Sequence, residues 1–128
     1  MLRELEEDTL TWLAEGSDEF EQSLLSDIMS YLEAHGLDPQ FSLKGLADSL
    51  DMSRPYLSQY FKKHTDQTIS GYVTDMRMTR SKELLETTDD TIQDISEEVG
   101  YYSVSSFIRK FRELEVMPPG QYRDNLSA

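Results

Sequence analysis

The chain repeats itself at an interval of about 50 residues, and this repeat limits the possible folds more than any other feature. Aligned on Phe61 and Phe111, the strings LSQYFKKHTDQTISGY and FIRKFRELEVMPPGQY carry apolar residues at equivalent positions. Upstream, LADSLDMS and ISEEVGYYS align with an offset of 49, so the second copy has one extra residue in its turn. Each copy predicts a short helix, a tight turn and a longer helix, which is the layout of a helix-turn-helix unit.

The remaining sequence is helical in pattern as well, because apolar residues recur at helical spacing and no sustained two-residue alternation predicts a strand. Hydroxyl side chains that cap helix starts, together with proline and glycine, set the limits of the predicted helices. We predict an all-α fold of two helix-turn-helix subdomains joined by a long linker helix, with an acidic N-terminal extension. The predicted helices cover residues 2–14, 18–35, 42–50, 53–64, 70–87, 91–99, 103–115 and 118–125.

The net charge of −13 argues by itself against a nucleic-acid partner, because one polyanion repels another. The charge is unevenly distributed, however, since residues 1–25 hold eight acids and one arginine. Nine of the twelve basic residues fall in three stretches without acids, at 52–65, 76–82 and 99–112. These stretches are either basic binding surfaces or ordinary solvated faces, and the charge pattern alone does not separate the two.

On a helical wheel, the longer helix of each copy has an apolar side and an opposite side that is polar and net positive. The outer sides are predicted to carry no carboxylate. The apolar sides are predicted to face the core through Leu57, Phe61 and His64 in the first helix and through Phe107, Phe111 and Leu114 in the second.

Gln59 and Arg109 lie at the centres of the two outer sides. In a DNA major groove glutamine pairs with adenine and arginine with guanine, while lysine and serine bind phosphates or bases. We therefore predict that both helices contact DNA, and plain surface residues are the alternative. The predicted base contacts are Arg54, Ser58, Gln59, Ser105 and Arg109, and the predicted phosphate contacts are Lys62, Lys63, Ser103, Ser106, Lys110 and Arg112.

The predicted linker helix supplies a length that can be compared with DNA. About 18 residues at ~1.5 Å each span ~27 Å. With the flanking turns, the two outer helices are expected about one DNA turn apart, ~34 Å. One chain can then enter two successive major grooves without forming a dimer.

The ordered motifs of both copies resemble the DNA-binding domain of the AraC/XylS family of bacterial transcription regulators. The first copy shows LA, YL, FKK and a closing LL, and the second shows EEVGY, two phenylalanines, a proline and YR. The resemblance implies a homeodomain-like fold of about seven helices and a sequence-specific regulator that binds double-stranded promoter DNA. It divides the chain into an extension or connector at 1–25 and an AraC-type domain at 26–124, with helix-turn-helix units at 42–65 and 91–115 around a linker helix at 70–87.

Several positions depart from the family pattern or need a partner. Asp66 and Val116 stand where glycines commonly end the two outer helices, and valine tolerates a left-handed backbone poorly. Ser81 and Ser96 stand where the family usually has alanine, so each adds a hydroxyl that needs a hydrogen bond. Arg77 of the linker helix is expected to pair with a carboxylate rather than with DNA.

The sequence gives little support for catalysis. It contains no cysteine, and its two histidines are isolated. Its six glycines are dispersed, so they form no phosphate-binding loop. The acidic residues Asp89, Asp90 and Asp94 are better explained by a helix start than by a metal site. We expect no enzymatic activity, no cofactor and no metal.

The partners that follow are promoter DNA, with RNA polymerase and an upstream sensor or receiver domain as further candidates from the resemblance. We expect a cytoplasmic protein without a membrane partner, since no stretch of the chain has the apolar length of a span. The alternative function is a protein-interaction module that has kept the fold and lost its affinity for DNA. The 17 acids and 11 bases outside residues 1–25, a net charge of −6, keep this alternative open.

Overall fold

The computed structural model describes residues 20 and 22–127, and within this part it consists of helices and turns without any strand. The all-α prediction is confirmed, and from residue 42 onward the helix bounds agree within one residue. The predicted helix 2–14 and the start of helix 18–35 lie outside the described residues. After a first helix over residues 22–35 come α2 (Leu43–Leu50), α3 (Arg54–Thr65), α4 (Ile69–Thr87), α5 (Ile92–Glu98), α6 (Val104–Glu115) and α7 (Pro119–Leu126).

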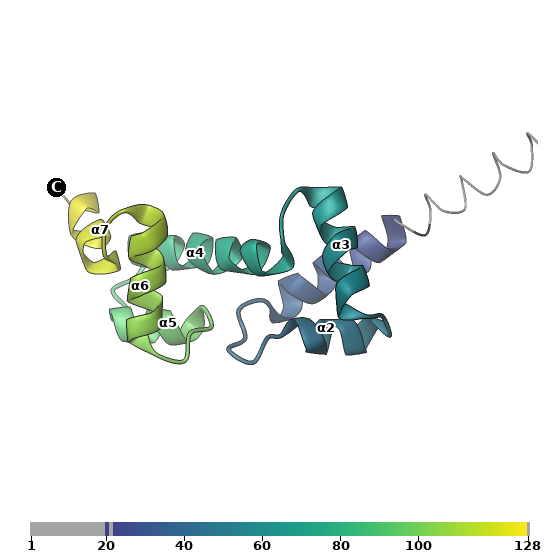
Figure 1. Cartoon of the computed structure of the whole chain (residues 1–128). Helices are drawn as coiled ribbons and strands as arrows, with labels where there is room; N and C mark the ends of the chain where they lie inside the picture. Colours follow the sequence, from purple (N-terminus) through teal and green to yellow (C-terminus); the bar gives the residue numbers. More distant parts are fainter. Residues whose placement is uncertain (1–19, 21, 128) are drawn as a thin grey trace, which may run out of the picture.

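The helices form two packed units at opposite ends of α4 (Figure 1). The helix 22–35 packs with α2 and α3 in one unit, and α5, α6 and α7 form the other. Helix α4 supplies core residues to both, with Ile69 and Val73 in the first core and Met78, Leu84 and Leu85 in the second. The long linker helix is therefore a structural member of both units.

Local capping explains why the helix starts were predictable. Five of the six labelled helices begin after a serine or threonine whose side-chain oxygen accepts the N–H of the residue three positions on, as expected of an N-cap. The proline pair supplies the start of α7 instead. The five caps are Ser42, Ser53, Thr68, Thr91 and Ser103.

The internal repeat is visible in the backbone. Helices α3 and α6 both have 12 residues and begin 50 positions apart. In the turns before them, Asp51 and Gly100 occupy equivalent positions and both have positive φ, 56° and 102°. The extra residue of the second turn is Tyr102, whose side chain is exposed.

Two residues predicted to face the core lie at the surface. Leu114 is half-exposed and His64 is exposed. In α3 the buried ring of Tyr60 ends the core one turn earlier, and the His64 ring packs on it at a centroid distance of 4.2 Å. In α6, Phe111 meets Tyr122 of α7 at 5.5 Å, which closes the core before Leu114.

The two buried serines have the partners that their hydroxyls require. Ser81 donates to the carbonyl of Met78 at 2.8 Å, and Ser96 donates to the carbonyl of Gln93 at 2.7 Å. Both bonds stay within one helix. Serine at these positions therefore leaves no hydroxyl unsatisfied in the core.

Arg77 joins the two units. The prediction that it pairs with a carboxylate is wrong, because its partners are main-chain carbonyls. Its Nε and Nη2 donate at 2.9 Å each to the carbonyls of Gly36 and Asp38, in the turn after the first helix. Its guanidinium carbon also lies 5.3 Å from the centre of the Tyr101 ring, in the turn before α6. The side chain thus holds a turn of the first unit against a turn of the second.

Val116, directly after α6, has a left-handed backbone. It adopts φ 70° with an exposed side chain, so the left-handed backbone costs energy that burial does not recover. We expect Val116→Gly to raise the free energy of unfolding by about 1 kcal/mol, measured as a higher urea midpoint at unchanged slope. Asp66→Gly, at φ 61°, is the matched control and is expected to gain less because aspartate tolerates this region. A lower midpoint for Val116→Gly would contradict the strain.

Candidate nucleic-acid interface

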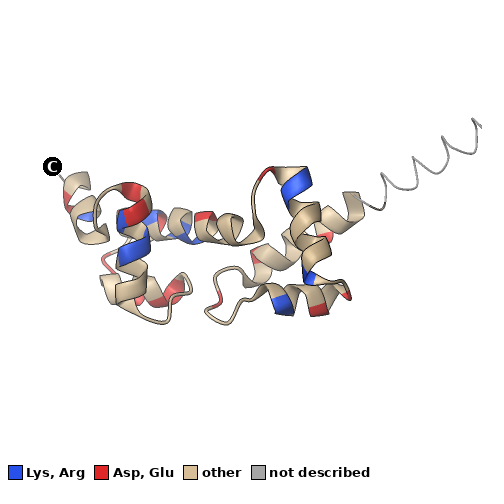
Figure 2. Ribbon diagram, viewed as in Figure 1, with Lys and Arg blue, Asp and Glu red and all other residues tan. Residues whose placement is uncertain are grey.

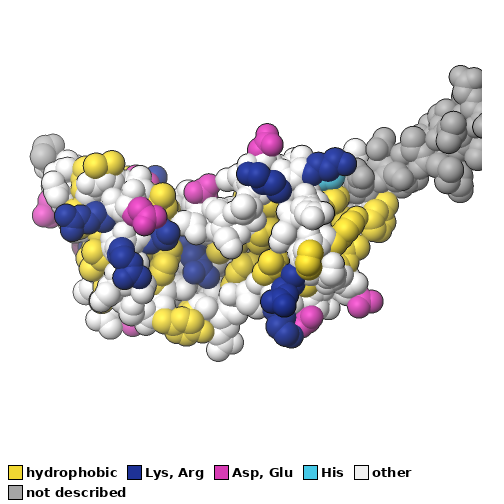
Figure 3. All heavy atoms as spheres, viewed as in Figure 1, with side chains coloured by type: hydrophobic (Ala, Val, Ile, Leu, Met, Phe, Trp, Pro, Cys, Tyr) yellow, Lys and Arg dark blue, Asp and Glu magenta, His cyan; other side chains and the backbone are white. Residues whose placement is uncertain are grey.

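Helices α3 and α6 lie in front of α4 at its two ends and run in the same direction (Figure 1). Each begins directly after the turn of its helix-turn-helix unit. Each buries an apolar side in the core of its own unit, formed by Leu57 and Phe61 in α3 and by Phe107 and Phe111 in α6. Their polar sides consequently face away from the protein on one common side. Basic side chains gather over both helices on this face (Figure 3).

The outer side of α3 combines hydrogen-bonding and basic groups. Arg54, Gln59, Lys62 and Lys63 are exposed and Ser58 is half-buried. Within the described residues, the side chains of Arg54, Gln59 and Lys63 make no hydrogen bond or ion pair, whereas the Lys62 side chain donates to the carbonyl of Asp66 at 3.2 Å. No carboxylate occurs in α3, as predicted. This helix presents donors that are available to an anionic ligand.

The outer side of α6 differs from the prediction in one respect, because it contains a carboxylate. A hollow of about 510 Å³ on this side is lined by Ser105, Ile108, Arg109, Arg112 and Glu113. Glu113 forms an ion pair with Lys110, with 3.1 Å between Glu113 Oε1 and Lys110 Nζ. The side chains of Arg109 and Arg112 make no hydrogen bond or ion pair with any described residue. The carboxylate-free surface therefore covers only the first turns of α6.

Two of the predicted phosphate-contacting serines mark the beginning of α6. Ser103 is its N-cap and accepts the N–H of Ser106 at 3.1 Å. Its hydroxyl also donates to the Ser106 hydroxyl at 2.9 Å. Ser103 thus has a capping role in the protein itself, and a phosphate contact by either serine stays a prediction.

The third basic stretch, at 76–82, faces the protein rather than a ligand. Arg80 pairs with Glu83 at 3.4 Å and with Glu98 at 3.6 Å, and Lys82 pairs with Glu115 at 3.2 Å. Figure 2 accordingly shows both basic and acidic residues on α4. Of the three acid-free stretches, only the two on α3 and α6 offer unpaired cations outward.

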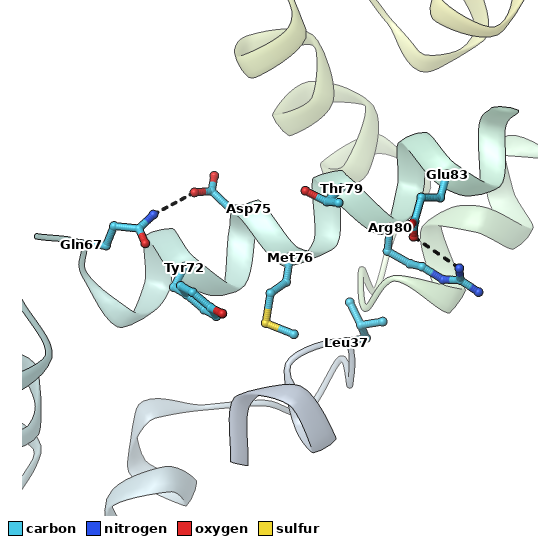
Figure 4. Close-up of a pocket in the computed structure, with 8 residues that line it drawn as sticks. All are labelled: Leu37, Gln67, Tyr72, Asp75, Met76, Thr79, Arg80 and Glu83. Atoms are coloured by element: carbon cyan, nitrogen blue, oxygen red, sulfur yellow. Dashed lines mark hydrogen bonds and ion pairs between the residues drawn. The ribbon is translucent and has the colours of Figure 1, made fainter. Parts of the chain in front are cut away.

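A groove of about 390 Å³ runs along α4 between the units (Figure 4). Tyr72, Met76 and Leu37 form its apolar part. Gln67 donates to Asp75 at 2.9 Å at one end, and the Arg80–Glu83 pair lies at the other. Its charged groups thus satisfy one another, so the groove does not extend the basic surface.

Two tyrosines carry shifted pKa values, and neither adds charge to the interface near neutral pH. Burial raises the pKa of Tyr101, against the opposing effect of the Arg77 guanidinium. The hydrogen bond to Glu86, at 2.8 Å, raises the pKa of Tyr122. Both phenols therefore remain protonated over the pH range in which DNA binding would be measured.

The sequence reasoning did not single out Ile108, which lies in the hollow of α6 beside Arg109. The signal was available, since Ile108 aligns with Ser58 of the first copy and is the apolar member of that pair. The described residues contain no group of three or more histidine, aspartate or glutamate side chains placed to hold a metal ion. Nor do they contain a helix long and apolar enough to cross a membrane.

Comparison with known proteins identifies the same domain. A family model described as a helix-turn-helix domain matches residues 46–125. The regulatory protein SoxS of Escherichia coli is 30% identical over 105 residues, which cover 82% of this chain and 97% of SoxS. The HTH-type transcriptional regulator YtdP of Bacillus subtilis is 34% identical over 99 residues, which cover 77% of this chain.

The structural comparison agrees with the sequence comparison. The C-terminal domain of the two-component response regulator yesN from Fusobacterium nucleatum superposes with a TM-score of 0.77 at 37% identity, covering 79% of this chain and 98% of that domain. This chain covers only part of some longer relatives. Its alignment with YtdP spans 13% of the length of YtdP. Its alignment with a further B. subtilis regulator, YobQ, spans 40% of the length of YobQ.

Proposed function

Since this chain belongs to the AraC/XylS family of helix-turn-helix transcription regulators, we propose that it binds promoter DNA sequence-specifically through α3 and α6 and so regulates transcription. The observation that carries the proposal is the common outward face of the two equivalent helices, with unpaired donors on each. We call α3 and α6 the recognition helices from here on.

Each recognition helix enters one major groove, and the two grooves follow each other along the same face of the duplex. Helix α4 has 19 residues, which at ~1.5 Å each gives ~28 Å, close to one DNA turn once the flanking turns are added. Gln59 and Arg109 read bases at the centre of each contact, together with Arg54, Ser58 and Ser105. Lys62, Lys63, Ser103, Ser106, Lys110 and Arg112 bind phosphates, with Lys110 first leaving its pair with Glu113.

Arg109→Ala tests the assignment of base contacts. Loss of a bidentate guanine contact is expected to cost about 1–3 kcal/mol and to relax the sequence preference at one position of the site. The measurement is binding to duplexes selected from a randomised library and to single-position variants of the best site.

Lys62→Ala is the matched control, because a phosphate contact is expected to weaken binding to all sequences alike and to reduce the salt dependence. A uniform loss for Arg109→Ala would demote Arg109 to a phosphate contact. If the unmodified chain bound no duplex above background, the protein-interaction module would replace the proposed function.

We also propose RNA polymerase and a sensor or receiver domain as partners, and the cytoplasm as the place of action. Support for a receiver domain comes from the yesN likeness, whose domain is the C-terminal part of a two-component response regulator. The division into an extension at 1–25 and a DNA-binding domain at 26–124 stays a prediction. The buried Leu24 shows that the first unit already begins to pack before residue 26.

A further inference from the structure

The two recognition helices differ chemically at the centre of their outer faces. The residues that line the hollow of α6 have equivalents 50 positions earlier in α3, so the faces can be compared pair by pair. One pair differs in polarity, since Ser58 of α3 corresponds to Ile108 of α6. The pairs are Pro55 and Ser105, Gln59 and Arg109, Ser58 and Ile108, Lys62 and Arg112, and Lys63 and Glu113.

Ile108 has one side on the protein and one side on solvent. It is half-buried and packs against the second core, next to Phe107 and Phe111. Its other side lines the open hollow of about 510 Å³ together with Arg109 and Arg112. The hollow therefore has an apolar part directly beside an unpaired guanidinium. The equivalent part of α3 is the hydroxyl of Ser58 beside the amide of Gln59.

The DNA major groove offers one apolar group on its base edges, the C5-methyl group of thymine. It also offers the O6 and N7 acceptors of guanine, which match the guanidinium fork of arginine. An isoleucine and an arginine at adjacent positions of one outer face are complementary to a thymine and a guanine close together. A hydroxyl and an amide at the equivalent positions of α3 have no such apolar complement.

We propose that Ile108 is a specificity-determining residue that packs against a thymine methyl group beside the guanine read by Arg109. The inference rests on the proposed function. We call the DNA contacted by α3 and the DNA contacted by α6 the two half-sites, and the inference means that they are recognised by different chemistry. The half-site of α6 requires the thymine methyl group, whereas Ser58 and Gln59 at the equivalent positions of α3 read their half-site by hydrogen bonds. The orientation of the chain on its site follows from this difference.

Replacing thymine with deoxyuridine tests the proposal, because the exchange removes one methyl group and leaves every base-pair hydrogen bond. Binding sites are first selected from a randomised duplex library with the full chain. Each thymine of the best site is then replaced singly, and dissociation constants are measured. At one thymine of the α6 half-site we expect about a fourfold loss, the factor that corresponds to ~0.8 kcal/mol for one buried CH₂ group.

The variants assign this loss to a side chain. In Ile108→Ala the fourfold effect of deoxyuridine at that thymine is expected to vanish, whereas Ile108→Val keeps most of it. Ser58→Ala is the matched control and leaves the effect unchanged. Because the effect is a ratio of two duplexes measured with one variant, a modest loss of stability in Ile108→Ala does not imitate the result, and thermal unfolding shows that each variant is folded.

Two failures are distinguishable. If no duplex is selected, the proposed function fails, and the assignment of Ile108 fails with it. If a site is selected but no thymine shows an effect that depends on Ile108, the proposed function stands and the inference is overturned. The inference is equally overturned if the sensitive thymine responds to Ser58→Ala instead of Ile108→Ala.

Discussion

Gly100→Ala is expected to lower the free energy of unfolding by about 3 kcal/mol, because the residue has a left-handed backbone and no room for a side chain. Its φ is +102°, a conformation that residues with a Cβ rarely adopt. An added Cβ would lie 2.7 Å from the Leu37 carbonyl oxygen and 2.9 Å from Arg77 Cζ. Neither neighbour can move easily, since the first is backbone and the second is held by two hydrogen bonds.

Gly120→Ala is the control for this prediction. A Cβ at Gly120 meets nothing within 4 Å, and the residue lies inside α7, so alanine is expected to stabilise the protein by up to about 1 kcal/mol. Both variants are compared by urea unfolding. Equal stability of Gly100→Ala and the unmodified chain would show that the contact between Gly100, Leu37 and Arg77 does not hold the two units together.

Arg123→Met is expected to cost about 3 kcal/mol of stability, since it removes three charge-assisted hydrogen bonds to main-chain oxygens. Arg123 lies in α7 and donates to the carbonyls of Leu85 at 3.2 Å, Thr88 at 3.1 Å and Asp90 at 2.6 Å. These oxygens belong to the end of α4 and the turn that leads to α5. The half-buried guanidinium thus takes the place of the missing helix-end partners.

Arg80→Met is the matched control for Arg123. Arg80 is an exposed arginine near this unit and makes only two long ion pairs, so its loss is expected to cost less than about 1 kcal/mol. Arg123→Lys keeps the charge and loses the planar fork, and an intermediate loss is expected. If Arg80→Met and Arg123→Met were equally stable in thermal unfolding, the main-chain bonds of Arg123 would contribute little.

Most of the helix boundaries could be predicted because the forces that set them are local. A hydroxyl such as that of Ser53 or Ser103 binds an N–H three residues away, so both partners are visible in a short stretch of sequence. The inward sides of α3 and α6 were equally predictable from the spacing of Leu57, Phe61, Phe107 and Phe111. Because the two copies align residue by residue, the outer positions of α3 also identified the outer positions of α6.

The errors concern contacts that depend on residues far away in the chain. The partners of Arg77 are 39 and 41 residues earlier, and they are main-chain carbonyls, which no side-chain pattern announces. His64 and Leu114 fit the helical period of the core, yet the packing partners end before them. Ile108 was overlooked for the same reason, since its half-buried position in a hollow depends on how α6 sits on the second core.

The continuous helix α4 has a consequence for how such a protein can change during evolution. One inserted residue would turn one recognition helix by about 100° relative to the other and would take its face off the duplex. Seven inserted residues would restore the direction but shift the contact by ~10 Å, or about three base pairs, by which point the groove itself has rotated away. Under the proposed function, the 19-residue length is therefore matched to the pitch of B-form DNA, and insertions and deletions are expected in the surface turns rather than in this helix.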